Sequence, residues 1–138
     1  MLLVVDANVV FSALVNKGET YQVFERNKKW KKFTFIAPEY MFSEIKKKTS
    51  KLLSVTSLTT DELQDAFIFI REQIETISFS EFSDMLPEAQ KRNLNDAPYI
   101  ALALKRRCPI FSGDKQLKQQ AKIPVYSPRE ILNILSRE

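Results

Sequence analysis

The sequence predicts a three-layer α/β/α domain in which helices cover both faces of a central parallel sheet. Three observations lead to this prediction. Short apolar runs alternate along the chain with longer helical patterns, as in parallel sheets with crossover helices. The first run, residues 2–5, is continuously apolar, which is typical of a strand buried on both faces. The length fits a single domain over residues 1–138, large enough for a core without disulfides.

Four further short segments are candidate strands. Their sequences are FTFIA, ISF, PIFS and PVY, and they cover residues 33–37, 77–79, 109–112 and 124–126. In a parallel α/β sheet, ligands bind at the carboxyl ends of the strands. The residues that directly follow these segments are therefore the first candidates for a functional site.

Helical patterns fill the intervals between the strands. Residues 61–76 follow a capping box at residues 59–62 and carry an apolar stripe that consists of Leu63, Phe67, Ile70 and Ile74. Residues 128–137 also begin with a capping box, with proline at the first helical position. Residues 97–106 are apolar all round before they become basic, so we expect this helix to be buried. One more helix is expected to begin near Pro38.

The amino-acid composition removes several kinds of chemistry. The chain has no histidine and a single cysteine, Cys108, so an internal disulfide, a Cys/His zinc site and a histidine base are all excluded. Any bound metal must therefore be held by oxygen ligands. No apolar run is long enough to span a membrane, and the start of the chain lacks an export signal. We therefore expect a cytoplasmic protein without membrane contact.

Four acidic residues fall at or near the expected carboxyl ends of strands. Asp6 directly follows the first strand, and Asp114 comes just after PIFSG. Asp96 lies at the start of the buried helix, and Glu44 lies in the helix that follows FTFIA. Two carboxylates at neighbouring strand ends repel one another unless a cation lies between them. The four acids are thus candidate ligands of a divalent metal ion.

Each acid also has a structural explanation, and the residues alone leave both alternatives open. Asp96 has the position of a helix cap, and Glu44 is spaced to pair with Lys48. Asp114 suits a turn or a helix N-terminus. Asp6 is harder to explain in this way, because a buried acid costs free energy unless it is paired or bound to a cation.

Small polar residues accompany two of the acids. Asn8 and Ser12 follow Asp6 on the expected turn and first helical turn, where they would orient the acid or a bound water. Ser112 and Gly113 precede the fourth acid, and the glycine lets the backbone approach a phosphate closely. The capping of helix ends explains the same small polar residues as well.

Basic residues flank an acidic stretch of the chain. Residues 59–90 hold one basic and eight acidic residues, whereas residues 1–58 and 91–138 hold ten basic residues each. Residues 28–32 place a tryptophan among four lysines, a pattern found in single-stranded nucleic-acid sites. The candidate nucleic-acid contacts are Lys28, Lys29, Trp30, Lys31, Lys32, Lys105, Arg106, Arg107 and Lys115. A solvated basic surface with a docked tryptophan is the alternative.

Several segments together resemble the PIN-domain family of metal-dependent ribonucleases, which includes the toxins of VapBC-type toxin–antitoxin pairs. The opening VVDANVVFSAL resembles the strand that ends in the first acid of the family. APEYMFSEI resembles the segment with the second acid, and LNDAPYIALALKRRCPIFSGDKQL resembles the segments with the third and fourth. The resemblance extends to about residue 128 and implies a parallel sheet of about five strands.

The resemblance also implies an activity. The residues that would bind Mg²⁺ or Mn²⁺ and catalyse hydrolysis of RNA phosphodiester bonds are Asp6, Glu44, Asp96 and Asp114. Ser112 would assist, and the expected partners are RNA, an antitoxin protein and a second copy of the chain in a homodimer. This chain has fewer acids than the family pattern at two places. Asn93 and Asn95 stand where some relatives have an acid, and Gln116 stands where many relatives have an acid. A catalytically idle PIN-like domain that binds nucleic acid or acts as a scaffold is therefore the alternative.

Two other classes of protein place acids at strand ends. A phosphatase of the haloacid-dehalogenase type would use Asp6 as its nucleophile, but that class requires a second aspartate where this chain has Asn8. A receiver-like signalling domain requires a phosphorylatable aspartate at a strand end in the middle of the chain, and the sequence offers none. Both classes therefore fit the sequence less well than the PIN-domain family.

Overall fold

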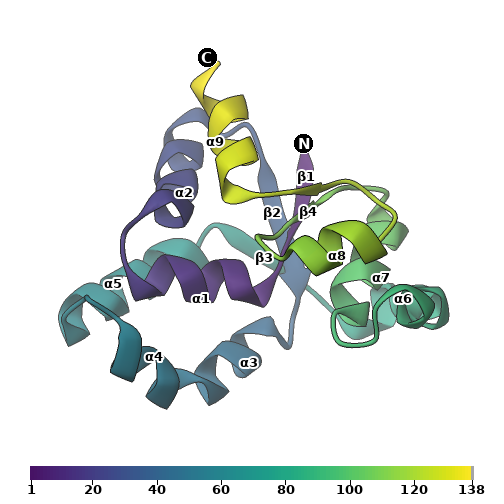
Figure 1. The fold of residues 1–138 in the computed structure, drawn as a ribbon, viewed down its shortest axis with the longest axis horizontal. Coiled ribbons are helices and arrows are strands. Elements are labelled where there is room, and N and C mark those ends of the chain that lie inside the picture. The colour runs from purple at the N-terminus through teal and green to yellow at the C-terminus, as the bar shows by residue number, and fades with distance from the viewer. Residues whose placement is uncertain (138) are drawn as a thin grey trace.

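The computed structural model describes residues 1–137, which form a five-stranded sheet surrounded by helices (Figure 1). The strands lie in the order β3-β2-β1-β4-β5, and every neighbouring pair is parallel. Their bounds are β1 Leu2–Val5, β2 Thr34–Pro38, β3 Ile74–Ile77, β4 Ile110–Phe111 and β5 Val125–Tyr126. The predicted α/β class and the parallel sheet of five strands are confirmed. The last residue of the predicted domain, residue 138, lies outside the described residues.

The central strand is β1, the continuously apolar segment at the start of the chain. Leu3, Val4 and Val5 are fully buried. Val4 pairs with Ile36 of β2 on one side and with Ile110 of β4 on the other. The chain builds β2 and β3 on one side of β1 and later builds β4 and β5 on the other side. The strand order therefore reverses at β1, and ligands of such sheets bind in the crevice at that carboxyl end.

Nine α-helices lie within the part of the chain that the structure describes. Their bounds are α1 Ala7–Val15, α2 Glu19–Trp30, α3 Met41–Lys47, α4 Thr49–Val55, α5 Thr60–Arg71, α6 Leu86–Arg92, α7 Ala97–Arg106, α8 Lys115–Gln120 and α9 Pro128–Ser136. Two short 3₁₀ turns, η1 Phe79–Glu81 and η2 Ser83–Met85, precede α6. Over residues 1–137, none of the helices has the length and apolar character needed to cross a membrane.

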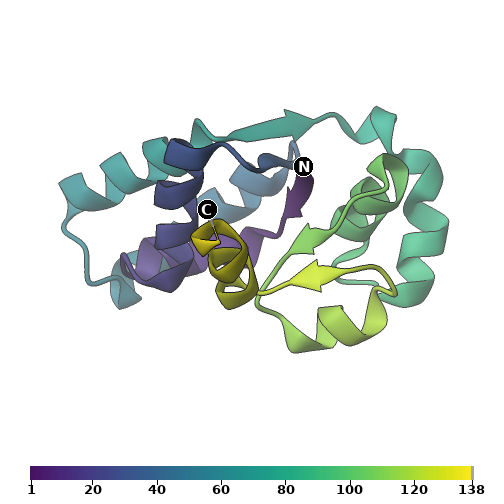
Figure 2. The ribbon, with the colours of Figure 1, turned by 90° about the horizontal axis from the view of Figure 1, so that it is seen from above.

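The helices α2 and α7 cover opposite faces of the sheet. The crossover from β1 to β2 and the crossover from β3 to β4 run in opposite directions along the sheet, so right-handed connections place their helices on opposite sides. On one face, Phe24 of α2 packs against Phe35 and Phe111, with ring centroids 5.1 and 6.1 Å away. On the other face, α7 contacts β1, β2 and β4. Figure 2 shows α4 and α5 toward one end of the molecule and α6 toward the other.

Two predicted helices begin at their capping boxes, and a third has the predicted bounds. The Thr59 hydroxyl accepts a hydrogen bond from the backbone of Glu62, whose carboxylate accepts one from the backbone of Thr59. Ser127 and Glu130 form the same reciprocal pair at the start of α9. The helix predicted over residues 97–106 is confirmed as α7, and most of its residues are buried.

One predicted boundary between helix and strand is wrong. The helix expected over residues 61–76 ends at Arg71, and Ile74 begins β3 instead of continuing the apolar stripe. Ile74 pairs with Phe35 of β2. Its side chain is therefore buried as part of the sheet and not as part of the apolar face of a helix. The strand predicted over residues 77–79 therefore begins three residues earlier and ends at its first predicted residue.

The start of the helix that carries Glu44 is also corrected. This helix begins at Met41 rather than near Pro38. Pro38 is the last residue of β2 and pairs with Ile77 of β3, so the strand continues through the position where a helix was expected to start. Glu44 nevertheless remains in the first turn of a helix that follows the carboxyl end of β2.

Candidate functional site

Asp6 ends β1 at the point where the strand order reverses. Its backbone N–H donates to the Phe111 carbonyl (3.1 Å), which continues the pairing of β1 with β4. Its carboxylate accepts hydrogen bonds from the Ser112 hydroxyl (2.8 Å) and the Asn8 backbone N–H (3.5 Å). The residue is only 2% exposed. This burial raises the pKa of Asp6 to about 6, and repulsion from Asp96 and Asp114 adds to the increase.

Ser112 links Asp6 to the fourth acid. Its hydroxyl donates to Asp6 and accepts a hydrogen bond from the backbone N–H of Asp114 (3.1 Å). Asp114 is the N-cap of α8, and its Oδ1 accepts hydrogen bonds from Gln116 N (2.9 Å) and Leu117 N (3.3 Å). The structural explanation of Asp114 as a helix N-terminus is thus correct, and one of its two carboxylate oxygens serves that role.

Asp96 lies at the N-cap position of α7, but its side chain makes no capping hydrogen bond. The capping explanation is therefore wrong for this carboxylate. Burial raises the pKa of Asp96, and repulsion from Asp114 and Glu44 raises it further. Asp96 is half-buried, has no capping partner and is repelled by its neighbours. Binding of a cation would therefore stabilise its ionised carboxylate.

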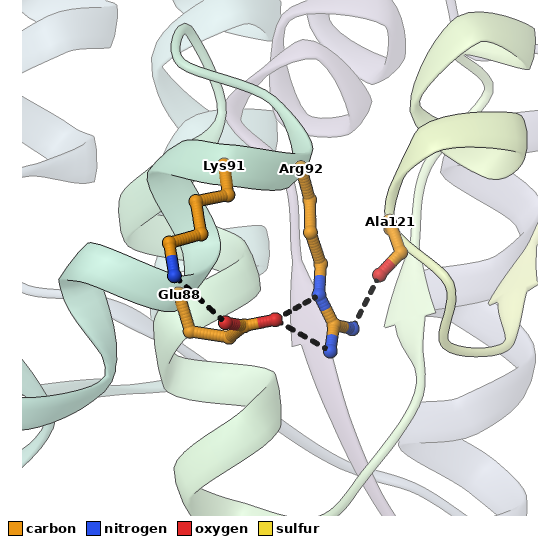
Figure 3. A network of polar contacts seen from close by, with 4 residues as sticks. All are labelled: Glu88, Lys91, Arg92 and Ala121. Carbon is orange, nitrogen blue, oxygen red and sulfur yellow. Dashed lines mark hydrogen bonds and ion pairs between the residues drawn. The ribbon is translucent and has the colours of Figure 1, made fainter.

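Arg92 and Asn93 connect the loop that carries Asp96 to α8. Arg92 donates to the Ala121 carbonyl at the end of α8 (2.7 Å), as Figure 3 shows, and also contacts Glu88. The Asn93 amide donates to the Gln120 side chain (2.7 Å), and its carbonyl oxygen accepts from the Asp96 backbone N–H (3.0 Å). Asn93 therefore holds the loop beside the helix that Asp114 begins.

Glu44 projects from the first turn of α3 and is half-buried. Its Oε1 accepts a hydrogen bond from the Tyr99 hydroxyl (2.7 Å). Within residues 1–137 no ion pair joins it to Lys48, so the expected i,i+4 pairing is wrong. Tyr99 was not predicted as a site residue, because it lies in a segment that is apolar all round. Its spacing of three residues from Asp96 puts both on one face of α7, and this was the available signal.

The four carboxylates influence one another but do not converge on a single point. Among residues 1–137, no group of three or more acidic or cysteine side chains is arranged so that it could hold a metal ion. The chemistry of the donor set does fit Mg²⁺ or Mn²⁺, since all four are hard oxygen donors. In the described part of the chain, none of the four forms an ion pair with a lysine or arginine. The charge of the cluster is therefore not compensated within residues 1–137.

Two of the predicted supporting residues line a depression beside the fourth acid. Asn8 and Ser12 on α1 line a depression of about 310 Å³ together with Gly113 and Asp114. The depression opens beside the carboxyl ends of β1 and β4. A larger apolar depression of about 680 Å³ lies between α3, α4 and α5, and none of the four acids lines it.

Most of the predicted nucleic-acid contacts lie at the opposite edge of the sheet. Residues 28–32 end α2 and lead into β2, and the ammonium group of Met1 donates to the Lys32 carbonyl (3.1 Å). Trp30 is 48% exposed there rather than docked. The helix α7 begins at the carboxyl ends of the strands, here called the carboxyl edge of the sheet. Residues 105–107 end this helix, so they lie at the amino ends of the strands, here called the amino edge.

Two of these cations are engaged by the acidic stretch of the chain. Lys105 pairs with Asp84 (2.7 Å) and Arg106 with Glu81 (3.3 Å). Lys115 differs from the other predicted contacts, because it follows Asp114 directly and lies in the first turn of α8. Of the nine predicted contacts, Lys115 is thus the one that the structure places beside an acid of the cluster.

A sequence model of the PIN-domain family matches residues 4–126, a range that includes all four acids. The chain belongs to the PIN-domain family. PIN domains are generally nucleases that depend on divalent metal ions. The resemblance seen in the sequence is therefore confirmed at the level of the family.

A solved structure has the same fold. This PIN domain resembles a chain in the crystal structure of VapBC2 from Rickettsia felis bound to a DNA fragment from their promoter. The TM-score is 0.63 at 17% sequence identity, and the match covers 92% of this chain and 98% of that chain. A likeness at this identity shows a common fold. A search of curated proteins gave no match.

Proposed function

We propose that this PIN domain is a metal-dependent endoribonuclease that hydrolyses phosphodiester bonds of RNA. One observation carries the proposal: carboxylates from distant segments lie near the reversal point of the sheet, close enough to influence one another, and burial and mutual repulsion raise the pKa of Asp6 and Asp96. Perturbed acids of this kind are typical of functional sites. The residues that would hold Mg²⁺ or Mn²⁺ are Asp6, Glu44, Asp96 and Asp114.

The residues of this chain have distinct roles in the proposal. Asp6 is fixed by Ser112, so it is the best-oriented ligand. Lys115, in the first turn of α8, would bind a phosphate group of the substrate. A bound divalent ion would activate a water molecule and neutralise charge on the phosphate, so the absence of histidine is no obstacle.

Metal binding would also rearrange part of the site. The side chains as they stand do not close around a cation. Glu44 is bonded to Tyr99, and Asp114 caps α8 through Oδ1, so these two acids hold competing hydrogen bonds. Asp96 holds no capping bond and needs no such exchange. We therefore expect Asp96 to bind a metal ion with the least rearrangement of existing hydrogen bonds.

Cleavage and melting measurements test the proposal together. The purified protein should cut RNA in Mg²⁺ or Mn²⁺ and not in EDTA, and the Asp6→Asn and Asp96→Asn variants should be inactive but folded. Millimolar Mg²⁺ or Mn²⁺ should raise the melting temperature of the parent, because a ligand at ten times its Kd stabilises by about 1.4 kcal/mol. The exposed acid Asp61 provides a control, and Asp61→Asn should behave as the parent. Cleavage by both Asp6→Asn and Asp96→Asn would contradict the assigned site.

A catalytically idle PIN domain is the second candidate function. The side-chain arrangement among residues 1–137 favours it, because no three ligands are within common reach of a metal ion. Gln116 and Asn93 also stand where the resemblance to the family leads us to expect acids, and the Asn93 side chain instead donates a hydrogen bond to Gln120 of α8. Binding of RNA without cleavage at any metal concentration would support this candidate.

We further propose that the protein is a cytoplasmic toxin of a VapBC-type pair, with an antitoxin partner, and that it forms a homodimer. Membership of the PIN-domain family and the fold shared with a chain of the VapBC2 structure support this proposal. A small DNA-binding protein encoded directly upstream should bind the purified protein and inhibit cleavage. Light scattering of the isolated protein would reveal a dimer, and a monomeric mass would contradict that part.

A further inference from the structure

Two tyrosines border the acids without a role in the proposed hydrolysis. Tyr99, on the first turn of α7, is 2% exposed and donates to Glu44. Tyr40, between β2 and α3, packs against it with ring centroids 6.0 Å apart and ring planes at 48°. Tyr40 is 37% exposed. The pair thus consists of a buried ring fixed to an acid and a partly exposed ring supported by the first.

The position of Tyr40 places its ring at the acidic cluster. It follows the carboxyl end of β2, the neighbour of β1, and its carbonyl accepts a hydrogen bond from Glu44 N (3.1 Å). The Tyr99 ring that packs against it is itself fixed by the hydrogen bond from its hydroxyl to Glu44 (2.7 Å). Burial raises the pKa of Tyr40, and the negative charges of Glu44 and Asp96 add to the increase. A ring supported by a second, fixed ring loses little conformational freedom when a ligand packs on it.

We propose that Tyr40 is a stacking platform for an unpaired nucleobase of the RNA substrate next to the acidic cluster. This inference rests on the proposed ribonuclease function. An aromatic ring accepts any base on its face, whereas a base inside a duplex is already stacked on its neighbours. The platform would hold the nucleotide beside the phosphate to be cut and would favour single strands without a strong sequence preference.

Other exposed aromatic side chains do not have this position. Trp30 is at the amino edge of the sheet, at the end of α2. Phe79 lies in η1, where its ring packs edge-on against Phe82. Trp30 is more exposed than Tyr40 but lies at the other end of the strands. A Trp30 variant therefore serves as a control for the position of the aromatic ring.

Binding in EDTA tests the platform independently of cleavage. Short single-stranded RNAs carry the fluorescent base 2-aminopurine at each position in turn, and stacking on an aromatic ring quenches its emission. The parent protein should quench one position, and an RNA duplex should show no such quenching. Tyr40→Ala should remove the quenching and weaken the affinity by roughly 5- to 100-fold. Tyr40→Phe keeps the ring and should retain both.

Cleavage kinetics provide the second readout. Tyr40→Ala should raise KM by a similar factor while kcat changes much less, because the ring binds the substrate and not the reacting phosphate. Tyr40→Phe should keep the parent KM. A merely structural role of Tyr40 would instead lower the melting temperature and reduce kcat in both variants.

The outcomes that overturn this inference differ from those that overturn the proposed function. Cleavage by the parent together with unchanged binding and quenching in Tyr40→Ala would overturn only the platform. Loss of quenching in Trp30→Ala but not in Tyr40→Ala would assign the platform to residues 28–32 instead. Equal quenching in duplex RNA and in single strands would contradict the stacking of an unpaired base on Tyr40. Absence of any RNA binding by the parent would overturn both this inference and the proposed function.

Discussion

At the scale of single residues, Asp6 carries the clearest electrostatic cost in the molecule. Desolvation outweighs the hydrogen bonds from Ser112 and Asn8, so the pKa of Asp6 rises to about 6. The ionised carboxylate therefore lowers the stability of the folded protein at neutral pH. Selection tolerates such a cost where the charge serves a function.

We expect Asp6→Asn to be more stable than the parent at neutral pH in EDTA. The folded-state pKa exceeds the unfolded-state value, so Asp6 costs nothing below about pH 4, and the cost develops as pH rises to about 6. The limiting difference for a shift of this size is about 3 kcal/mol. Urea denaturation of both proteins should give a gap that opens between these two pH values. A gap that is constant with pH would contradict the raised pKa of Asp6.

The sequence indicated the acids individually but not their hydrogen-bond partners. The order of residues along the chain predicted Asp6 and Asp114 at strand ends, because an acid after an apolar run has few other positions. It did not predict that Tyr99 donates a hydrogen bond to Glu44, because the two residues are 55 positions apart in the sequence and lie on different helices. Asn93 was taken as a missing acid, and only the position of α8 shows that its amide holds the loop.

At the scale of elements, the connection between α6 and α7 determines where Asp96 lies. Arg92 crosses from the end of α6 to the last carbonyl of α8, and Glu88 holds its guanidinium from the other side (Figure 3). Lys91 contacts the same Glu88 at 3.9 Å but is exposed to solvent. Two neighbouring cations thus share one acid, and only Arg92 joins two elements of the site.

Arg92→Ala should therefore destabilise the protein and weaken metal binding. Loss of a charge-assisted hydrogen bond to a backbone carbonyl costs about 1–2 kcal/mol, and the freed loop would hold Asp96 less firmly. The measurements are urea denaturation and the shift in melting temperature with Mn²⁺. Lys91→Ala is the matched control, and it should change stability by less than about 0.5 kcal/mol. An equal effect of the two substitutions would show that Arg92 acts only as a surface ion pair.

The elements that the sequence predicted well are those with local signals. The capping boxes gave the starts of α5 and α9, since both partners of each box lie within four residues. Ile74 was placed in a helix because four-residue spacing continues the stripe from Ile70. Its pairing with Phe35 depends on a strand far away in the sequence, so no local pattern could reveal it.

At the scale of the whole molecule, the basic and acidic groups are separated along the strands. In a parallel α/β sheet, a helix that leaves the carboxyl edge ends at the amino edge. The basic last turns of α2 and α7 therefore lie opposite the carboxylates, although both stretches looked like substrate contacts in the sequence. This separation follows from the topology, which the charge pattern alone does not contain.

The salt dependence of RNA binding should reflect this separation. Replacement of Lys28 and Lys29 by Gln should leave the slope of log Kobs against log salt concentration unchanged, because both lie at the amino edge. Lys115→Gln should reduce the slope by about 0.7, the value for one phosphate contact with a single strand. Fluorescence anisotropy at several salt concentrations measures both. A smaller slope in the variant without Lys28 and Lys29 would instead show that residues 28–32 contact RNA.

The hydrogen bond from Ser112 to Asp6 spans 106 positions of the chain, and this has a consequence for synthesis on the ribosome. At about 5–20 residues per second, the first acid waits roughly 5–20 s for its partner to be translated. During that time β1 can pair with β2 but has no β4, so a nascent or truncated chain lacks the third and fourth acids in place. Under the proposed function, nuclease activity would therefore begin only when nearly the whole chain has emerged.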